Sequence, residues 1–101
     1  MKIVAIKTLR EFWERHPAAE QPLKTWADDV NRASWATPAD IKATYRNASF
    51  LHNRRMVFNI KGNDYRLIVS VAYRFQAVYV KFVGTHAEYD RVDAQTVEIE
   101  V

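Results

Sequence analysis

Helical spacing of apolar residues dominates the first third of the chain, and strand-like alternation dominates the second half. The short apolar run 2–6 predicts a strand. Thr8 begins a capping-box pattern, so we expect it to cap a helix that Pro17 ends. A second amphipathic helix is predicted from about 18 to 33. The apolar positions with helical spacing are Leu9, Phe12 and Trp13, then Leu23, Trp26, Ala27 and Val30.

Weaker signals follow these helices. Thr37 and Pro38 are typical of a helix start, with the proline at the first helical position, and this helix is expected to end near Thr44. Residues 45–54 are ambiguous, although 49–51 are compatible with an extended segment. At the other end, residues 96–101 alternate like a strand and are equally compatible with a loose acidic tail.

A first hairpin is predicted from the chemistry of its turn. Residues 56–61 alternate as a strand, Gly62 and Asn63 suit a two-residue turn, and Asp64 opens the return strand. Such a loop determines the pairing. The expected pairs are Lys61 with Asp64, Asn59 with Arg66, and Val57 with Ile68 on one face, and Ile60 with Tyr65, Phe58 with Leu67, and Met56 with Val69 on the other.

A second hairpin is expected if Phe75 and Gln76 form the next turn. The two hairpins then agree on which side of the shared strand is apolar, and a one-residue slip would expose the apolar set to water. The expected pairs are Arg74 with Ala77, Ala72 with Tyr79, Ser70 with Lys81 and Arg66 with Thr85, and on the apolar face Tyr73 with Val78, Val71 with Val80 and Val69 with Phe82.

The predicted sheet therefore has two unlike faces. The apolar face requires a cover, and the two N-terminal helices are available to provide it. We therefore predict an α+β fold with two N-terminal helices on one face of a small antiparallel sheet. The other face carries five basic residues and no acid before Asp64, which favours an anion-binding surface over an ordinary solvated face. The basic residues are Arg55, Lys61, Arg66, Arg74 and Lys81.

Length, cysteine content and net charge limit the number of domains and the kinds of functional site that this chain can have. With 101 residues, we expect one domain spanning 1–101. The chain has no cysteine, which excludes disulfides, thiolate metal sites and a cysteine nucleophile. A net charge of +3 is weak evidence for a nucleic-acid partner by itself. We find no pattern of a signal peptide or membrane span, so a cytoplasmic protein without membrane association is expected.

Acid–base chemistry on RNA is the activity that the polar residues favour. Cleavage by the 2′-hydroxyl of RNA needs a base, an acid and a cation for the phosphorane oxygens. His86 is a candidate acid or base, and Arg66 has the forked geometry that suits a phosphate. Tyr89 is a candidate for base stacking or proton donation, and Asp90 for orienting His86. As the ordinary alternative, Tyr89 and Asp90 simply open a short C-terminal helix.

Flanking contacts to RNA are predicted for four further residues. No spacing of histidines or carboxylates indicates a metal site, so the chemistry is expected to be metal-free and to need no cofactor. His16 and His52 have no partner pattern and receive no role. The predicted RNA-binding residues are Asn59, Lys61, Arg74 and Lys81.

Two segments of this region resemble a known family. Residues 57–69, VFNIKGNDYRLIV, and 80–90, VKFVGTHAEYD, are similar to the HigB-type toxins of the RelE-like group. The shorter pieces at 16–17, 20–23 and 37–39 are also similar, so the resemblance covers most of the chain. It implies a RelE-like α+β fold and an mRNA interferase, a metal-independent endoribonuclease that cleaves translated messages on the ribosome.

The resemblance also implies partners and roles. The expected partner is a HigA-like helix-turn-helix antitoxin, and operator DNA would be contacted only through the antitoxin complex. Arg66 matches the arginine that acts on the scissile phosphate in RelE-like toxins, whereas His86 stands where several relatives have an arginine. Two alternatives remain open: a non-catalytic module that blocks translation by occupying RNA or the ribosome, and a protein–protein module that acts only as a co-repressor.

Overall fold

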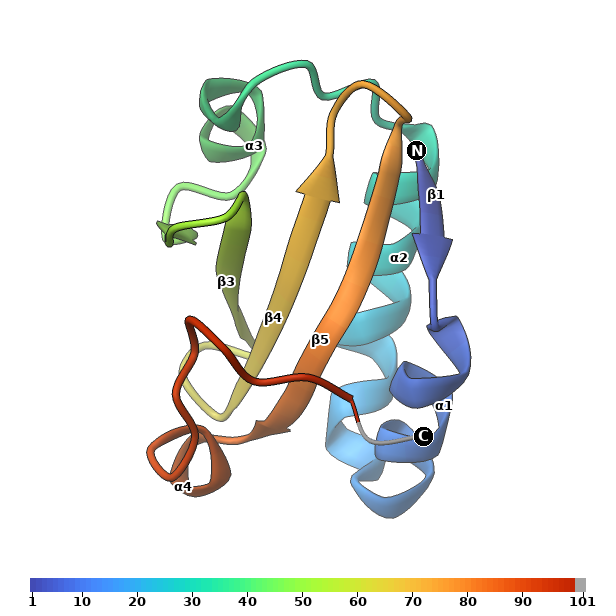
Figure 1. Ribbon diagram of the computed structural model, residues 1–101. Helices are drawn as coiled ribbons and strands as arrows, with labels where there is room; N and C mark the ends of the chain where they lie inside the picture. Colours follow the sequence, from blue (N-terminus) through green and yellow to red (C-terminus); the bar gives the residue numbers. More distant parts are fainter. Residues whose placement is uncertain (100–101) are drawn as a thin grey trace.

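A five-stranded sheet in the order β1-β5-β4-β3-β2 forms the centre of the protein (Figure 1). The structure is a computed structural model that describes residues 1–99. Only β1 and β5 pair in parallel among these strands, and the other neighbours are antiparallel. The strands are β1 (Lys2–Val4), β2 (Ser49–Phe50), β3 (Arg55–Ile60), β4 (Tyr65–Ala72) and β5 (Ala77–Thr85).

The helices α1 and α2 lie behind the sheet in the view of Figure 1 and cover one of its faces. The α+β fold predicted from the sequence is therefore confirmed, and the short strands β1 and β2, which fall within the expected segments 2–6 and 49–51, form the two edges of the sheet. The helical elements are α1 (Ile6–Arg15), a 3-10 turn (Pro17–Ala19), α2 (Glu20–Arg32), α3 (Pro38–Thr44) and α4 (His86–Tyr89).

The helix starts are only partly as predicted. Helix α1 begins at Ile6, two residues before the predicted cap Thr8, and its N-cap Ala5 has a left-handed backbone with φ 74°. Thr8 instead donates its backbone N–H to the Ala5 carbonyl inside the first turn. Helix α3 begins as predicted, and Asp40 completes a capping box with Thr37.

The core between the helices and the sheet is built from the predicted stripes. Leu9 and Phe12 of α1 and Leu23, Trp26 and Val30 of α2 are almost completely buried. They pack on the apolar positions of the three central strands. Burying one such side chain contributes roughly 1.5–3 kcal/mol, so this layer holds the sheet in place. The strand residues of this layer are Met56, Phe58, Ile60, Leu67, Val69, Val71, Val78 and Val80.

The first hairpin has the predicted register. Asn59 lies opposite Arg66, and Val57 lies opposite Ile68. The turn between them is closed by a 3.2 Å hydrogen bond from the Asp64 N–H to the Lys61 carbonyl. Lys61 and Gly62 have φ values of 52° and 65°, the left-handed region that a tight hairpin turn uses and that glycine adopts at low cost.

The second hairpin departs from the prediction. Its loop has four residues, 73–76, so Ala72 pairs with Ala77 and Ser70 with Tyr79. The Gln76 side chain stabilises this wider turn, because its Nε2 donates to the carbonyls of Trp35 and Tyr73, each at 2.9 Å. The predicted two-residue turn at Phe75 and Gln76 is therefore wrong.

A β-bulge then shifts the register again. Pairing passes from Val69–Val80 to Ile68–Phe82, which leaves Lys81 as the extra residue of β5. As a result Phe82 lies on the open face, opposite Ile68, and not on the helix-covered face as predicted. Arg66 lies opposite Gly84, and the expected pair of Arg66 with Thr85 does not form.

The C-terminal segment, residues 91–99, crosses the face of the sheet that the helices leave open (Figure 1). Arg55 is only 6% exposed on this face, and its guanidinium donates to the carbonyls of Ala94 and Val97 at 3.2 and 2.7 Å. Glu98 accepts from Arg55 at 3.0 Å and forms an ion pair with Lys81 at 2.9 Å. The part of 96–101 that the structure describes is therefore an acidic tail docked on the sheet, and not a strand.

Candidate active site

Helix α4 follows β5 directly and carries two of the predicted catalytic residues, His86 and Tyr89, and a third, Asp90, is its C-cap. Its first turn is held by a capping box, in which the Glu88 N–H donates to Thr85 Oγ1 at 3.1 Å and the Thr85 N–H donates to Glu88 Oε1 at 2.8 Å. The His86 N–H donates to the Asp64 carbonyl at 3.1 Å, which ties the helix to the first hairpin. Tyr89 and Asp90 therefore close this helix and do not open it.

The hydrogen bond from the Thr85 backbone lowers the pKa of Glu88 below its ordinary value, and the nearby charges of His16 and Arg15 act in the same direction. Glu88 thus stays ionised at neutral pH, and its carboxylate remains an acceptor for the Thr85 N–H. The first turn of α4 is consequently fixed by local chemistry.

His86 and Asp90 contact each other, as expected if Asp90 orients His86. His86 Nδ1 lies 3.1 Å from Asp90 Oδ2, one helical turn along the chain. Both side chains are more than half exposed. Because the carboxylate occupies Nδ1, the imidazole is oriented and Nε2 is the nitrogen that can exchange a proton with a substrate.

Arg66 lies beside α4. Its guanidinium carbon is 5.7 Å from the centre of the Tyr89 ring, and its Nη1 donates to the Asn63 carbonyl at 3.0 Å. Tyr89 and His86 are three residues apart, so they are neighbours on the helix surface. Arg66, Tyr89, His86 and Asp90 thus form one cluster at the junction of the first hairpin and α4, and we call these four residues the α4 cluster.

Two of the predicted RNA-binding residues border the α4 cluster. Asn59 is half-buried opposite Arg66, as predicted. Lys61 is exposed in the hairpin turn, and its Nζ lies 3.4 Å from a carboxylate oxygen of Asp64. Thr85 was expected to pair with Arg66, but it pairs with Tyr65, and its hydroxyl accepts the Glu88 N–H in the cap of α4.

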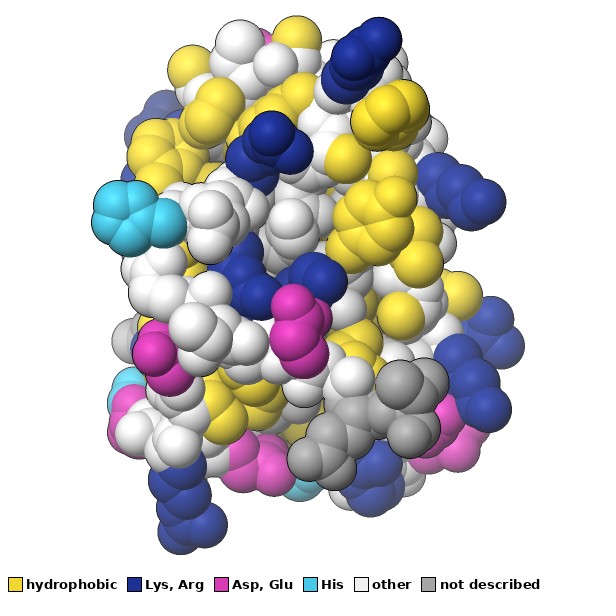
Figure 2. All heavy atoms as spheres, viewed as in Figure 1, with side chains coloured by type: hydrophobic (Ala, Val, Ile, Leu, Met, Phe, Trp, Pro, Cys, Tyr) yellow, Lys and Arg dark blue, Asp and Glu magenta, His cyan; other side chains and the backbone are white. Residues whose placement is uncertain are grey.

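The other two predicted RNA-binding residues lie elsewhere. Lys81 forms an ion pair with Glu98, a carboxylate that it shares with Arg55, so its charge is partly compensated. Arg74 lies in the loop just past the opposite end of β4, whose last residue, Ala72, is about 20 Å along the strand from Arg66. A single acid-free basic face therefore does not exist, and in Figure 2 an acidic side chain lies directly against basic ones in the middle of this face.

His16 was given no role from the sequence, yet it lies close to α4. Its ring stacks on Phe12 with 4.4 Å between ring centres and lies 5.9 Å from Tyr65. It also contributes to the lowered pKa of Glu88. No local pattern indicates this proximity, because it depends on how the end of α1 packs against β4.

Residues 1–99 contain neither a cluster of metal ligands nor a membrane-spanning helix. Within residues 1–99, no group of three or more His, Asp or Glu side chains gathers to hold a metal ion. In the same range, none of the helices has the length and apolar character needed to cross a membrane.

Comparison with known protein families decides the class. The model of the HigB toxins, described as the RelE-like toxic component of a toxin–antitoxin system, matches residues 19–92. The chain belongs to the HigB toxin family. The matched range contains all four residues of the α4 cluster and the predicted RNA-binding residues.

Individual HigB proteins are similar over nearly the whole chain. The mRNA interferase toxin HigB of Escherichia coli K12 is 28% identical over 93 residues, which cover 89% of this chain and 88% of the relative. The mRNA interferase HigB of Shigella flexneri has the same identity and coverage. The mRNA interferase HigB of Escherichia coli O6:H1 is 22% identical over 94 residues, or 91% of both chains.

Membership in the HigB family has one direct consequence. A toxin of this class is one half of a toxin–antitoxin pair, so the protein has a cognate antitoxin as its partner. The fold and the family thus agree that the chain is a RelE-like toxin, and the α4 cluster is the candidate for its chemistry.

Proposed function

We propose that the protein is an mRNA endoribonuclease that acts on translated messages at the ribosome and is neutralised by a HigA-like helix-turn-helix antitoxin. The observation that carries this proposal is the α4 cluster, in which Arg66, a residue type suited to a phosphate, and His86, a residue type suited to proton transfer, stand on neighbouring elements. The names of the relatives as mRNA interferases support the same reaction class.

The reaction we propose is metal-independent attack by the 2′-hydroxyl of the RNA. A bond forms between the 2′-oxygen and phosphorus, and the bond from phosphorus to the 5′-oxygen breaks. The products are a 2′,3′-cyclic phosphate and a 5′-hydroxyl. One proton leaves the 2′-hydroxyl and another reaches the leaving 5′-oxygen, so the site must provide a base and an acid.

The roles follow from the contacts. His86 carries one of the two proton transfers through Nε2, and Asp90 holds the ring through Nδ1. Arg66 uses one part of its guanidinium on the Asn63 carbonyl and presents further N–H groups to the phosphorane oxygens. Tyr89 either stacks on a base or supplies the second proton.

Positions at the rim complete the RNA site. Asn59 and Lys61 lie on the hairpin beside Arg66 and are proposed to hold the flanking nucleotides. We place the protein in the cytoplasm, because its proposed substrate is translated mRNA. Operator DNA is contacted only through the antitoxin. The domain is proposed to span 1–101.

Expression of the protein in bacteria without its antitoxin tests the proposal. We expect growth arrest and new 5′ ends within coding sequences, detected by primer extension. Replacing Arg66 and His86 together by alanine should abolish both effects, because loss of an acid–base group costs about 10²–10⁴-fold in rate and loss of a charge-stabilising donor about 10²–10³-fold.

The matched control replaces Arg10 and His52 by alanine, the same two residue types at exposed positions away from α4. This variant should remain as toxic as the parent, and both variants should show the parent's circular dichroism spectrum. Undiminished toxicity of the Arg66/His86 variant would overturn the site. Growth arrest with intact messages would instead support the non-catalytic alternative, in which the toxin blocks translation by occupancy.

A further inference from the structure

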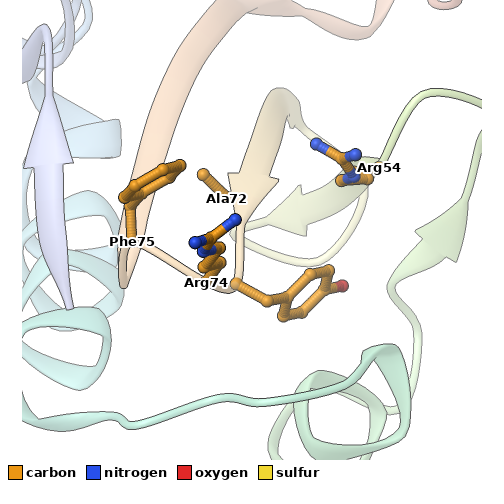
Figure 3. A pocket seen from close by; sticks show the side chains of 5 residues that line it. Arg54, Ala72, Arg74 and Phe75 are labelled. Atoms are coloured by element: carbon orange, nitrogen blue, oxygen red, sulfur yellow. The ribbon is translucent and has the colours of Figure 1, made fainter.

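A hollow lies at the end of the sheet that is remote from α4. It has a volume of about 380 Å³, within the ~300–1,000 Å³ range of ligand pockets. Arg54 enters from the turn before β3, and Arg74 and Phe75 come from the loop between β4 and β5 (Figure 3). We call this hollow the hairpin-loop pocket, and its lining is completed by Ala72 and Tyr73.

Phe75 is the most exposed large apolar side chain of the described residues, at 74%. The guanidinium carbon of Arg74 lies 5.7 Å from the centre of its ring, and Figure 3 shows the two side chains next to each other. Folding leaves this ring in water, since no part of the core covers it. An aromatic face beside an arginine is the arrangement on which unpaired nucleic-acid bases stack.

Arg54 supplies a second positive charge from a fixed position. Its carbonyl accepts the Val71 N–H at 2.9 Å, and its backbone is left-handed with φ 61°. Among the residues the structure describes, no carboxylate forms an ion pair with Arg54 or Arg74. Asp40 acts on the lining from a distance: its charge helps to raise the pKa of Tyr73, after the larger effect of burial.

The surface around the pocket also carries exposed aromatic and basic side chains. Tyr79 is 38% exposed and lies on the open face opposite Ser70, on the same side of the sheet as Ala72. In Figure 2 the acidic side chains of this view gather mainly in the lower half, whereas basic and hydrophobic side chains adjoin each other in the upper half. The end of the sheet near the hairpin loop therefore combines positive charge with exposed aromatic rings.

We propose that the hairpin-loop pocket binds single-stranded RNA, with a base stacked on Phe75 and the adjoining phosphate held by Arg54 and Arg74. An acidic peptide would use the arginines but would leave the ring without a partner, so the combination favours a nucleotide. The pocket lies at the far end of β4, about 20 Å along the strand from Arg66, so it takes a different stretch of RNA from the one bound at the α4 cluster.

Binding of a fluorescein-labelled twelve-residue oligouridylate, measured by anisotropy without ribosomes, tests this site. The His86→Ala protein serves as the parent, so that cleavage does not interfere. Phe75→Ala should weaken binding by about tenfold or more, as expected for one lost base stack. Arg74→Gln and Arg54→Gln should each reduce the slope of log affinity against log salt by about 0.7.

The matched control removes Phe50, another exposed phenylalanine, which lies near Lys42 on a different part of the surface. Phe50→Ala should keep the parent's affinity within twofold. Equal affinities of the Phe75→Ala and Phe50→Ala proteins would overturn the proposal. This outcome is separate from the proposed cleavage, because binding is measured on a protein that lacks the catalytic histidine.

A fluorescent reporter separates base stacking from general attraction of anions. In a Phe75→Trp protein, the added indole should be quenched when oligouridylate binds, whereas polyglutamate of the same length should not quench it. In a Phe50→Trp protein, neither should change the emission. If polyglutamate displaces the oligonucleotide at the same concentration as unlabelled RNA, the pocket is a site for acidic peptides, and the RNA assignment is wrong.

Discussion

Arg55→Met tests whether the C-terminal segment is held on the sheet by one buried guanidinium. Arg55 is 6% exposed and donates to the carbonyls of Ala94 and Val97 and to Glu98. Methionine keeps a long apolar side chain in the same place, so the substitution removes the charge and the donors with little change in packing.

The magnitude follows from the two carbonyl contacts. Hydrogen bonds to a charged group contribute about 1.5–3 kcal/mol each, which gives roughly 3–6 kcal/mol for the pair. Two effects reduce this loss of free energy. The variant no longer pays the desolvation of a buried guanidinium, and the freed carbonyls lie near the surface, where water can reach them. We therefore expect the free energy of unfolding to fall by about 2–3 kcal/mol.

Urea denaturation followed by tryptophan fluorescence measures this loss, and the melting temperature should fall by about 10–20 °C. Limited trypsin digestion provides a local readout, since cleavage after Arg91 should accelerate when the segment detaches. Arg10→Met makes the same chemical change on the exposed side of α1 and should leave both quantities near those of the parent. A variant at Arg55 within about 0.5 kcal/mol of the parent would refute the reasoning.

Two further predictions concern α4 and the helix layer. Thr85→Ala removes the hydroxyl that caps α4, so it should lower the free energy of unfolding by about 1 kcal/mol and reduce RNA cleavage in cells. Thr8→Ala is the control, because the Thr8 side chain caps no helix, and it should change neither quantity. Burial and a hydrogen bond to Asp29 raise the pKa of Tyr45 above its ordinary value, so the folded state keeps this proton at a pH where the unfolded state releases it. The free energy of unfolding should therefore fall as the pH rises above about 10. Tyr45→Phe should cost about 1 kcal/mol at pH 7, and urea titrations of this variant should show a smaller fall in stability at high pH. An identical fall in both proteins would contradict this cause.

Much of the α4 cluster was predictable because its geometry is local. His86 and Asp90 are four residues apart, and a helix of any origin brings such residues together. Asn59 and Arg66 face each other because the two-residue turn at Gly62 and Asn63 determines the register. In these cases the chemistry of a few neighbouring residues is sufficient.

The second hairpin shows where local reasoning fails. Its wider loop is stabilised by a contact between Gln76 and the Trp35 carbonyl, two residues separated by 41 positions. The bulge that isolates Lys81 then moves Phe82 to the other face. Alternation alone cannot locate such a bulge, because Val80 and Phe82 fit an uninterrupted strand equally well.

The prediction of an acid-free basic face failed for the same reason, since it too depends on contacts between segments that are distant in the sequence. The amino-acid sequence by itself determined the amphipathic helices, the first hairpin and the contact of His86 with Asp90, since each depends on residues within a few positions. Only the tertiary structure decided that Glu98 forms ion pairs with both Arg55 and Lys81. It likewise placed Gly84, and not Thr85, opposite Arg66, because ion pairing and long-range register arise from segments that meet only after the chain has folded.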